Sequence, residues 1–180
     1  ISMPTALFPF WADQLHATWA LGLFYAAGTV GSIIVTLTSG WVKRYQKHGR
    51  AITFAAIGWG ISIAFAGATK SIWVTLFFLT LAGASDMVSA LFRGLIWNQS
   101  IADEYRGRLA GIELLSYSVG PLGGQLRAGS MAAWTNLRTS VVSGGLICIA
   151  FIGFFASILP DYRKYDADTN EFAQNEREKR

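Results

Sequence analysis

The chain has 180 residues, of which 52% are hydrophobic and only 14% are charged, and its mean hydropathy is +0.37. A soluble domain carries about 25% charged residues, so this composition argues against a soluble globular domain and for a membrane protein. The net charge of +4 would suit nucleic-acid binding only if the basic residues gathered on one exposed face. They are instead confined to short connectors between apolar segments, so we expect no nucleic-acid partner.

Five apolar segments are long enough, or nearly long enough, to cross a bilayer, which takes about 20 helical residues. Before them, "MPTALFPFW" resembles the end of a further helix, and because the chain begins at Ile1 we expect it to be part of a longer protein. The sequence therefore predicts an all-α, polytopic transmembrane helical bundle over residues 1–160 whose first helix is truncated. The five segments are residues 17–41, 51–69, 71–97, 109–134 and 139–159.

The positive charges alternate between connectors. The segments "KRYQKHGR" and "DEYRGR" and the final residues 161–180 together hold eleven Lys and Arg, whereas the remaining connectors hold three. The positive-inside rule then predicts that the basic set and the C-terminus are cytoplasmic, in the inner membrane of the cell. Residues 161–180 are polar and lack periodicity, so we expect a disordered cytoplasmic tail. The cytoplasmic loop residues of interest are Gly40, Lys43, Arg44, Arg50, Arg106 and Arg108.

Two of the apolar segments contain charged residues at membrane depth. Residues 51–69 and 139–159 carry no Asp, Glu, Lys, Arg or His, and such helices can face lipid. Segments 71–97 and 109–134 differ: Arg93 lies in the first and Glu113 in the second, each about one turn from the same membrane face. A charge at this depth costs at least about 2.5 kcal/mol, so it marks a function or a partner. We predict that Arg93 and Glu113 pair, either as a structural ion pair or as a gate that opens during transport.

Asp86 lies close to the middle of its segment, with Arg93 two turns further along the same face. No partner at the level of Asp86 is evident from the sequence. An intramembrane carboxyl without a partner is a candidate proton carrier, and this is the first interpretation. The second is a hydrogen-bonded packing residue near Ser89.

Small residues follow two patterns. Gly28, Ser32, Thr36 and Gly40 recur every four residues and share one helix face, which predicts close helix packing. The sequence "GPLGG" interrupts segment 109–134, where the proline removes a helical donor and the glycines loosen the backbone. We consider two interpretations of the predicted kink, a structural bend and a bend that gates a cavity; its residues are Gly120, Pro121, Gly123 and Gly124.

Aromatic and polar side chains cluster on the same segments as the charges, and an aromatic ligand could stack on them. For Trp97, a place in the interfacial aromatic belt is an equally good interpretation. We find no metal-ligand spacing, no phosphate-binding loop and no nucleophile–base motif, so we expect neither an enzyme nor a cofactor. The candidate cavity residues are Phe24, Tyr25, Ser89, Trp97 and Tyr117.

Several of these stretches resemble the C-terminal half of the major facilitator superfamily. "FPFWADQLHATWALGLFYAAGTVGSIIVTLTSGWVKR" resembles the end of helix seven, the outer loop and helix eight of that family. "SGWVKRYQKHGR" is similar to its loop between helices eight and nine, "DEYRGRLAG" to that between helices ten and eleven, and "GPLGG" to an antiporter signature. "FPFWAD", "GLFYAA" and "LTSG" resemble the enterobactin-exporter and drug:proton antiporter branch.

The resemblance implies a proton-coupled exporter of drugs or siderophore-like molecules that works by alternating access. Its expected partners are the lipid bilayer, the N-terminal half of the same transporter, a small-molecule substrate and protons. Segments 17–41, 71–97 and 109–134 would line the cavity, and the two uncharged segments would be peripheral. A nutrient-uptake symporter on the same fold and a membrane subunit that does not transport are the alternatives.

Overall fold

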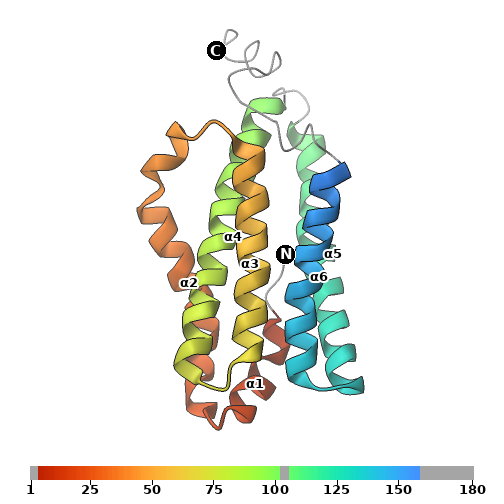
Figure 1. Cartoon of the computed structure of the whole chain (residues 1–180). Helices are drawn as coiled ribbons and strands as arrows, with labels where there is room; N and C mark the ends of the chain where they lie inside the picture. Colours follow the sequence, from red (N-terminus) through yellow and green to blue (C-terminus); the bar gives the residue numbers. More distant parts are fainter. Residues whose placement is uncertain (1–3, 102–105, 159–180) are drawn as a thin grey trace.

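The computed structural model describes residues 4–101 and 106–158, and this part of the chain is all-α (Figure 1). The predicted tail, residues 161–180, lies outside the described residues. In chain order the elements are η1 (Thr5–Leu7), α1 (Phe8–Gln14), η2 (Thr18–Ala20), α2 (Leu21–Leu37), η3 (Ser39–Arg44), α3 (His48–Ala68), α4 (Ile72–Ser100), α5 (Arg106–Trp134) and α6 (Leu137–Ile158).

Four helical stretches are long and apolar enough to cross a membrane. On length and composition, the chain is a multi-pass membrane protein whose apolar helices contact the lipid bilayer. Helix α5 is long enough, with 29 residues, but is not one of the four. Glu113, Gln125 and Arg127 make it more polar, so the predicted span over residues 109–134 is confirmed only as a helix. The four are Thr18–Leu37, His48–Ala68, Ile72–Trp97 and Leu137–Ile158.

Successive helices from α2 to α6 run in alternating directions, which places their connectors at two ends of the bundle (Figure 1). The connector 38–47, the end of α4 and the start of α5 lie together, and we call this the basic end. Helix α1, residues 69–71 and residues 135–136 lie at the other end, the α1 end. The predicted alternation of the connectors is therefore confirmed.

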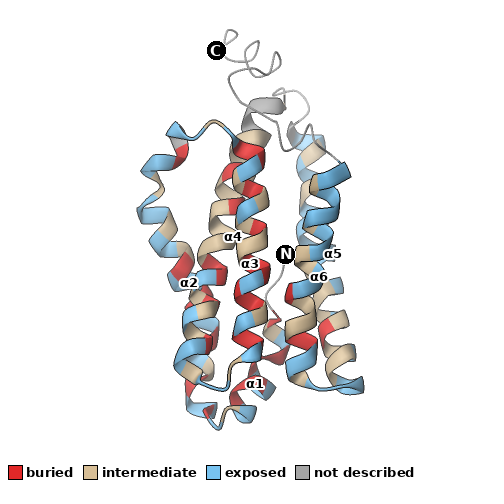
Figure 2. Ribbon diagram, viewed as in Figure 1, coloured by how far each residue is buried: buried red, intermediate tan, exposed pale blue. Residues whose placement is uncertain are grey.

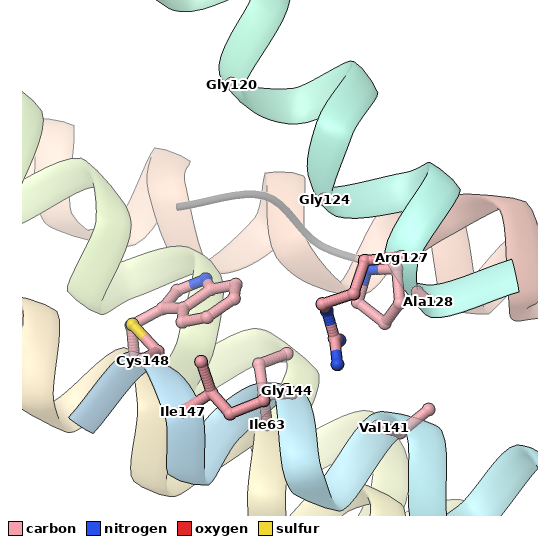
Figure 3. A pocket seen from close by; sticks show the side chains of 11 residues that line it. Ile63, Gly120, Gly124, Arg127, Ala128, Val141, Gly144, Ile147 and Cys148 are labelled. Atoms are coloured by element: carbon pink, nitrogen blue, oxygen red, sulfur yellow. The ribbon is translucent and has the colours of Figure 1, made fainter. Parts of the chain in front are cut away.

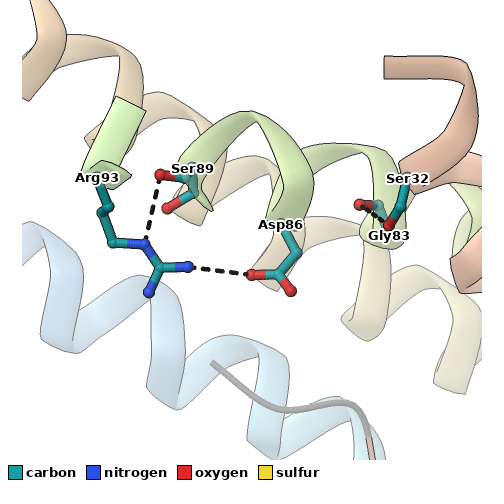
Figure 4. Close-up of polar contacts among 5 residues, drawn as sticks. All are labelled: Ser32, Gly83, Asp86, Ser89 and Arg93. Carbon is teal, nitrogen blue, oxygen red and sulfur yellow. Dashed lines mark hydrogen bonds and ion pairs between the residues drawn. The ribbon is translucent and has the colours of Figure 1, made fainter. Parts of the chain in front are cut away.

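Helices α2 and α4 approach each other closely through small residues. A Cβ added to Gly31 would lie 2.7 Å from the backbone nitrogen of Ala84, so only glycine fits there. The Ser32 hydroxyl donates across the interface to the Gly83 carbonyl at 3.2 Å (Figure 4). The helix face predicted to pack closely, which carries Gly28, Ser32, Thr36 and Gly40, is therefore only partly buried. Thr36 is exposed, and Gly40 lies beyond the end of α2 in η3, where it is also exposed.

Helix α3 packs between α4 and α6 and is the most buried of the four apolar helices, as Figure 2 shows. In the apolar 18-residue stretch of each helix, 44% is buried for α3 but only 11% for α6. The α3–α6 contact is close, because a Cβ on Gly145 would lie 2.8 Å from the Ala64 nitrogen. The expectation that both uncharged segments can face lipid therefore suits α6, whereas α3 forms the centre of this bundle.

An aromatic core joins α1 to α2. The Phe8 ring lies 5.6 Å from the Phe24 ring and 5.1 Å from the Tyr25 ring, and Trp11 packs on Phe24 at 5.7 Å. Phe8 and Phe24 are fully buried. Edge-to-face contacts at these distances add about 0.5–1.5 kcal/mol per pair beyond burial. These contacts hold the short helix α1 across the end of the bundle.

Candidate functional site

The charged residues of α4 form an ion pair within that helix. Asp86 is at the middle of α4 and Arg93 is seven residues later, so the two side chains project from the same face. The Arg93 Nη2 atom lies 3.8 Å from the Asp86 Oδ1 atom, and the Arg93 Nε atom donates to the Ser89 carbonyl at 3.3 Å (Figure 4). About a third to a half of each charged side chain is exposed, at 36% for Arg93 and 45% for Asp86. The pair thus lies on an open face of α4.

The predicted pair between Arg93 and Glu113 does not form in this structure. The guanidinium is held by Asp86 on its own helix, and its neighbour on α5 is the Tyr117 ring, whose centroid is 5.8 Å from the Arg93 Cζ atom. The expectation that Asp86 lacks a partner is therefore also wrong. Two turns of helix separate the Cα atoms of Asp86 and Arg93 by only about 10 Å. The long arginine side chain spans this distance.

A cavity of about 420 Å³ lies between the second half of α4 and the first half of α5. Arg93, Trp97, Glu113 and Tyr117 line it, and most of the remaining wall is apolar. Arginine over an aromatic ring is a cation–π contact worth about 0.5–1 kcal/mol where it is exposed. The tertiary structure therefore brings four of the predicted residues together around one cavity.

The other predicted cavity residues lie elsewhere. Phe24 is fully buried in the aromatic core, and the Tyr25 hydroxyl donates to the Thr5 carbonyl at 3.3 Å, toward the α1 end. Ser89 is buried beneath Arg93, to which its carbonyl oxygen is the acceptor. These three residues do not line the α4–α5 cavity.

The "GPLGG" stretch does not break α5, because the helix is continuous from Arg106 to Trp134 with Pro121 inside it. Proline has no backbone N–H, so the helical hydrogen bond to the carbonyl four residues earlier, that of Tyr117, is lost. The weak point in the backbone thus coincides with the aromatic wall of the α4–α5 cavity. Gly120 and Gly124 line a second cavity, whereas a Cβ on Gly123 would meet nothing within 4 Å.

The second cavity, of about 200 Å³, lies between α3, α5 and α6, and Arg127 projects into it (Figure 3). The Arg127 Nη2 atom donates to the Ser140 carbonyl at 3.5 Å, directly over Gly144. A Cβ on Gly144 would lie 2.6 Å from this nitrogen, so glycine makes room for the guanidinium. In the sequence, Arg127 is one of two charged residues within segment 109–134 and lies near the edge of a connector, with no partner assigned to it. The glycines on the facing segment were the available signal for its packed position.

Aromatic contacts hold the connector 38–47 and the first residue of α3, His48, on α4. The rings of Trp41, Tyr45 and His48 lie 5.7, 5.8 and 5.4 Å from that of Phe92, which is fully buried. Because Phe92 precedes Arg93, this connector and the ion pair share one turn of α4. Among the predicted loop residues, Gly40, Arg44, Arg50 and Arg108 are exposed, and the side chains of Lys43 and Arg106 are outside the described part.

The described residues define a polytopic membrane protein with an ion pair at mid-depth beside an apolar cavity. Within residues 4–101 and 106–158, no three His, Cys, Asp or Glu side chains are grouped so that they could hold a metal ion. Comparisons of the chain with protein-family models, with curated proteins and with solved structures give no match.

Proposed function

We propose that this chain is one helical bundle of a secondary active transporter that exports small molecules in exchange for protons by alternating access. The observation that carries the proposal is the Asp86–Arg93 pair. Both charges lie at membrane depth on α4, and both side chains are partly exposed among the described residues. Ionisable residues at this depth are rare and mark ion or substrate pathways by default.

The pair offers a simple means of coupling. With Asp86 ionised, Arg93 is neutralised by a carboxylate at 3.8 Å. Protonation of Asp86 would remove that attraction and leave the guanidinium with the Ser89 carbonyl and the Tyr117 ring. A change in proton occupancy at mid-depth would thus alter the contact between α4 and α5, which line the same cavity. A two-state helix contact that a proton biases is what coupled transport requires.

The α4–α5 cavity supports an aromatic or amphipathic substrate. Its volume of about 420 Å³ lies within the roughly 300–1,000 Å³ of small-molecule sites, and it combines apolar walls with Trp97, Tyr117 and a few charged groups. Drugs and siderophore-like molecules, which the resemblance to the major facilitator superfamily implies, have this character. The α4–α5 side of the bundle is therefore where we place the substrate.

The uncovered helix α5 supports an arrangement in which a second bundle completes the cavity. Helix α5 packs mainly on α6 and η1. Its apolar residues Ile112, Leu122 and Leu126 are 64%, 67% and 73% exposed. We propose that the N-terminal half of the same transporter covers this face. We also propose that the basic end is cytoplasmic, since it carries most of the Lys and Arg.

The test is efflux of a fluorescent drug panel and a catecholate siderophore from cells that express the chain together with its N-terminal half. Wild type and Asp86→Asn are compared at matched expression, each with and without a protonophore. Gradient-dependent efflux that disappears in Asp86→Asn supports a proton-coupled exporter. Gradient-dependent accumulation would instead indicate an uptake symporter, and no movement of any solute would indicate a subunit that does not transport.

A further inference from the structure

The few basic side chains at the α1 end all line two adjoining cavities. His16, Lys70 and Arg138 line a cavity of about 370 Å³ between α1, the end of α3 and the start of α6, which we call the end cavity. Arg127 lines the second cavity described above, and Val141 lines both. These four are all the Lys, Arg and His side chains that the described residues place at this end. Their convergence therefore needs a physical reason.

Gathering cations at one site is unfavourable unless an anion offsets their repulsion. In the described ranges, 4–101 and 106–158, none of the four lies within ion-pair distance of a carboxylate. Asp13, the acidic residue at this end, is exposed on α1 and does not line the end cavity. Like charges a few ångströms apart repel by about 1 kcal/mol even in water, and by more beside a low-dielectric wall. The described residues therefore supply no compensating charge.

The end cavity also provides neutral donors and a helix N-terminus. Trp11 and Gln14, whose side chains carry neutral N–H donors, are among the residues that line it. Helix α6 begins at Leu137 in the same wall and carries the positive end of its dipole there. Arg138 uses one nitrogen to donate to the Ala68 carbonyl, and its remaining guanidinium donors are available because the group has five. Guanidinium, ammonium and helix N-termini together are the donor set that recognises phosphate.

We propose that the end cavity binds a phosphate group, through Lys70 and Arg138 with His16 beside them. The α1 end is one of the two ends of the membrane-spanning helices, so it lies at the depth of lipid headgroups. The phosphate can therefore belong to a phospholipid headgroup or to a free phosphate-bearing solute. The cavity volume of about 370 Å³ accommodates either. This site is separate from the α4–α5 cavity and does not depend on transport.

The experiment measures binding to the full chain in detergent by native mass spectrometry and by thermal unfolding. The lipid probe is dioleoyl phosphatidylglycerol, compared with dioleoyl glycerol, which has the same acyl chains and no phosphate. The free probe is inorganic phosphate, compared with chloride at equal ionic strength. The variant Lys70→Gln/Arg138→Gln is matched by Lys47→Gln/Arg50→Gln, which removes the same charge at the basic end.

We expect the Lys70→Gln/Arg138→Gln variant to bind phosphate-bearing probes at least about tenfold more weakly, because the loss of one charge-assisted contact alone has about that effect and the variant loses two. The matched variant should bind as wild type does. Binding of phosphatidylglycerol with no response to inorganic phosphate assigns a lipid headgroup, and stabilisation by inorganic phosphate assigns a free solute. Unchanged binding in the Lys70→Gln/Arg138→Gln variant, or an equal loss in the matched variant, overturns the proposal.

Because Arg138 also bonds to the end of α3, its loss could unfold the protein. The variant His16→Asn/Lys70→Gln avoids this, since neither side chain makes a hydrogen bond within the described residues and asparagine tolerates the positive φ of 52° at position 16. The same weakening of phosphate binding is expected with an unchanged melting temperature. Full phosphate binding by this folded variant would likewise contradict the proposal.

Discussion

Arg93 and Asp86 face each other across two turns of α4 at 3.8 Å, and neither charge is fully buried. Each side chain therefore neutralises the charge of the other at membrane depth. Removing one leaves an uncompensated charge, whereas removing both leaves a neutral helix face. The difference between these two situations can be measured.

We predict that Asp86→Asn lowers stability by about 1 kcal/mol, a value kept small because both side chains are partly exposed. The double variant Asp86→Asn/Arg93→Gln should recover part of that loss, because no unpaired cation remains. Thermal unfolding of wild type, Asp86→Asn, Arg93→Gln and the double variant, all in one detergent, measures the coupling between the two side chains. Strictly additive losses would show that the two side chains do not interact energetically.

The α2–α4 contact predicts a second result. Gly31→Ala places a methyl group against the backbone of α4, and overpacking of this kind costs about 1–3 kcal/mol. Gly22→Ala on the same helix meets nothing within 4 Å and serves as the control. Melting temperatures of the two variants should therefore diverge, with Gly22→Ala close to wild type. Similar values for both would mean that the helices do not approach as closely as described.

Pro121→Ala should stiffen α5. Alanine restores the helical hydrogen bond to the Tyr117 carbonyl and removes a clash that costs about 3 kcal/mol in an unrelaxed helix. We expect higher thermal stability together with slower transport, because the α4–α5 cavity then has a less pliable wall. Efflux rates at matched expression, with melting temperatures alongside, test this. Unchanged or faster transport in Pro121→Ala would contradict the prediction that the proline aids transport by making this wall pliable.

The Arg93–Tyr117 contact predicts a difference between two substitutions at one position. Tyr117→Phe keeps the ring beneath the guanidinium, so substrate binding should change less than twofold, whereas Tyr117→Ala removes the ring and should weaken it about three- to fivefold. Equilibrium binding of a fluorescent drug to the protein in detergent provides the measurement. Equal effects of the two substitutions would assign the role to the hydroxyl group instead.

The opposite ends of the bundle can be placed by labelling. Two single-cysteine variants are made in a Cys148→Ser background. Lys70→Cys should react with a membrane-impermeant maleimide added to intact cells, whereas Lys47→Cys should react only after permeabilisation. Both positions are exposed, so a lack of reaction reflects the side of the membrane and not burial. The reverse pattern would invert the proposed topology.

Composition and hydropathy alone predicted an all-α membrane protein, its apolar helices and the alternation of its connectors. These properties follow from local chemistry, because a bilayer demands continuous apolar helices whose hydrogen bonds are satisfied internally. The polar residues of α5 are evident in the sequence, yet segment 109–134 was predicted as a span. Helix α5 is not one of the four candidate spans.

The tertiary structure alone decided which charges meet. Arg93 could reach Asp86 along its own helix or Glu113 on the next one, and sequence spacing permits both. The separation of α4 and α5 and the position of Tyr117 between them select Asp86. The gathering of His16, Lys70 and Arg138 around one cavity depends likewise on how three distant segments fold against one another. Hydropathy acts residue by residue along the chain, but a partner is chosen by distance in space, which only the packed helices set.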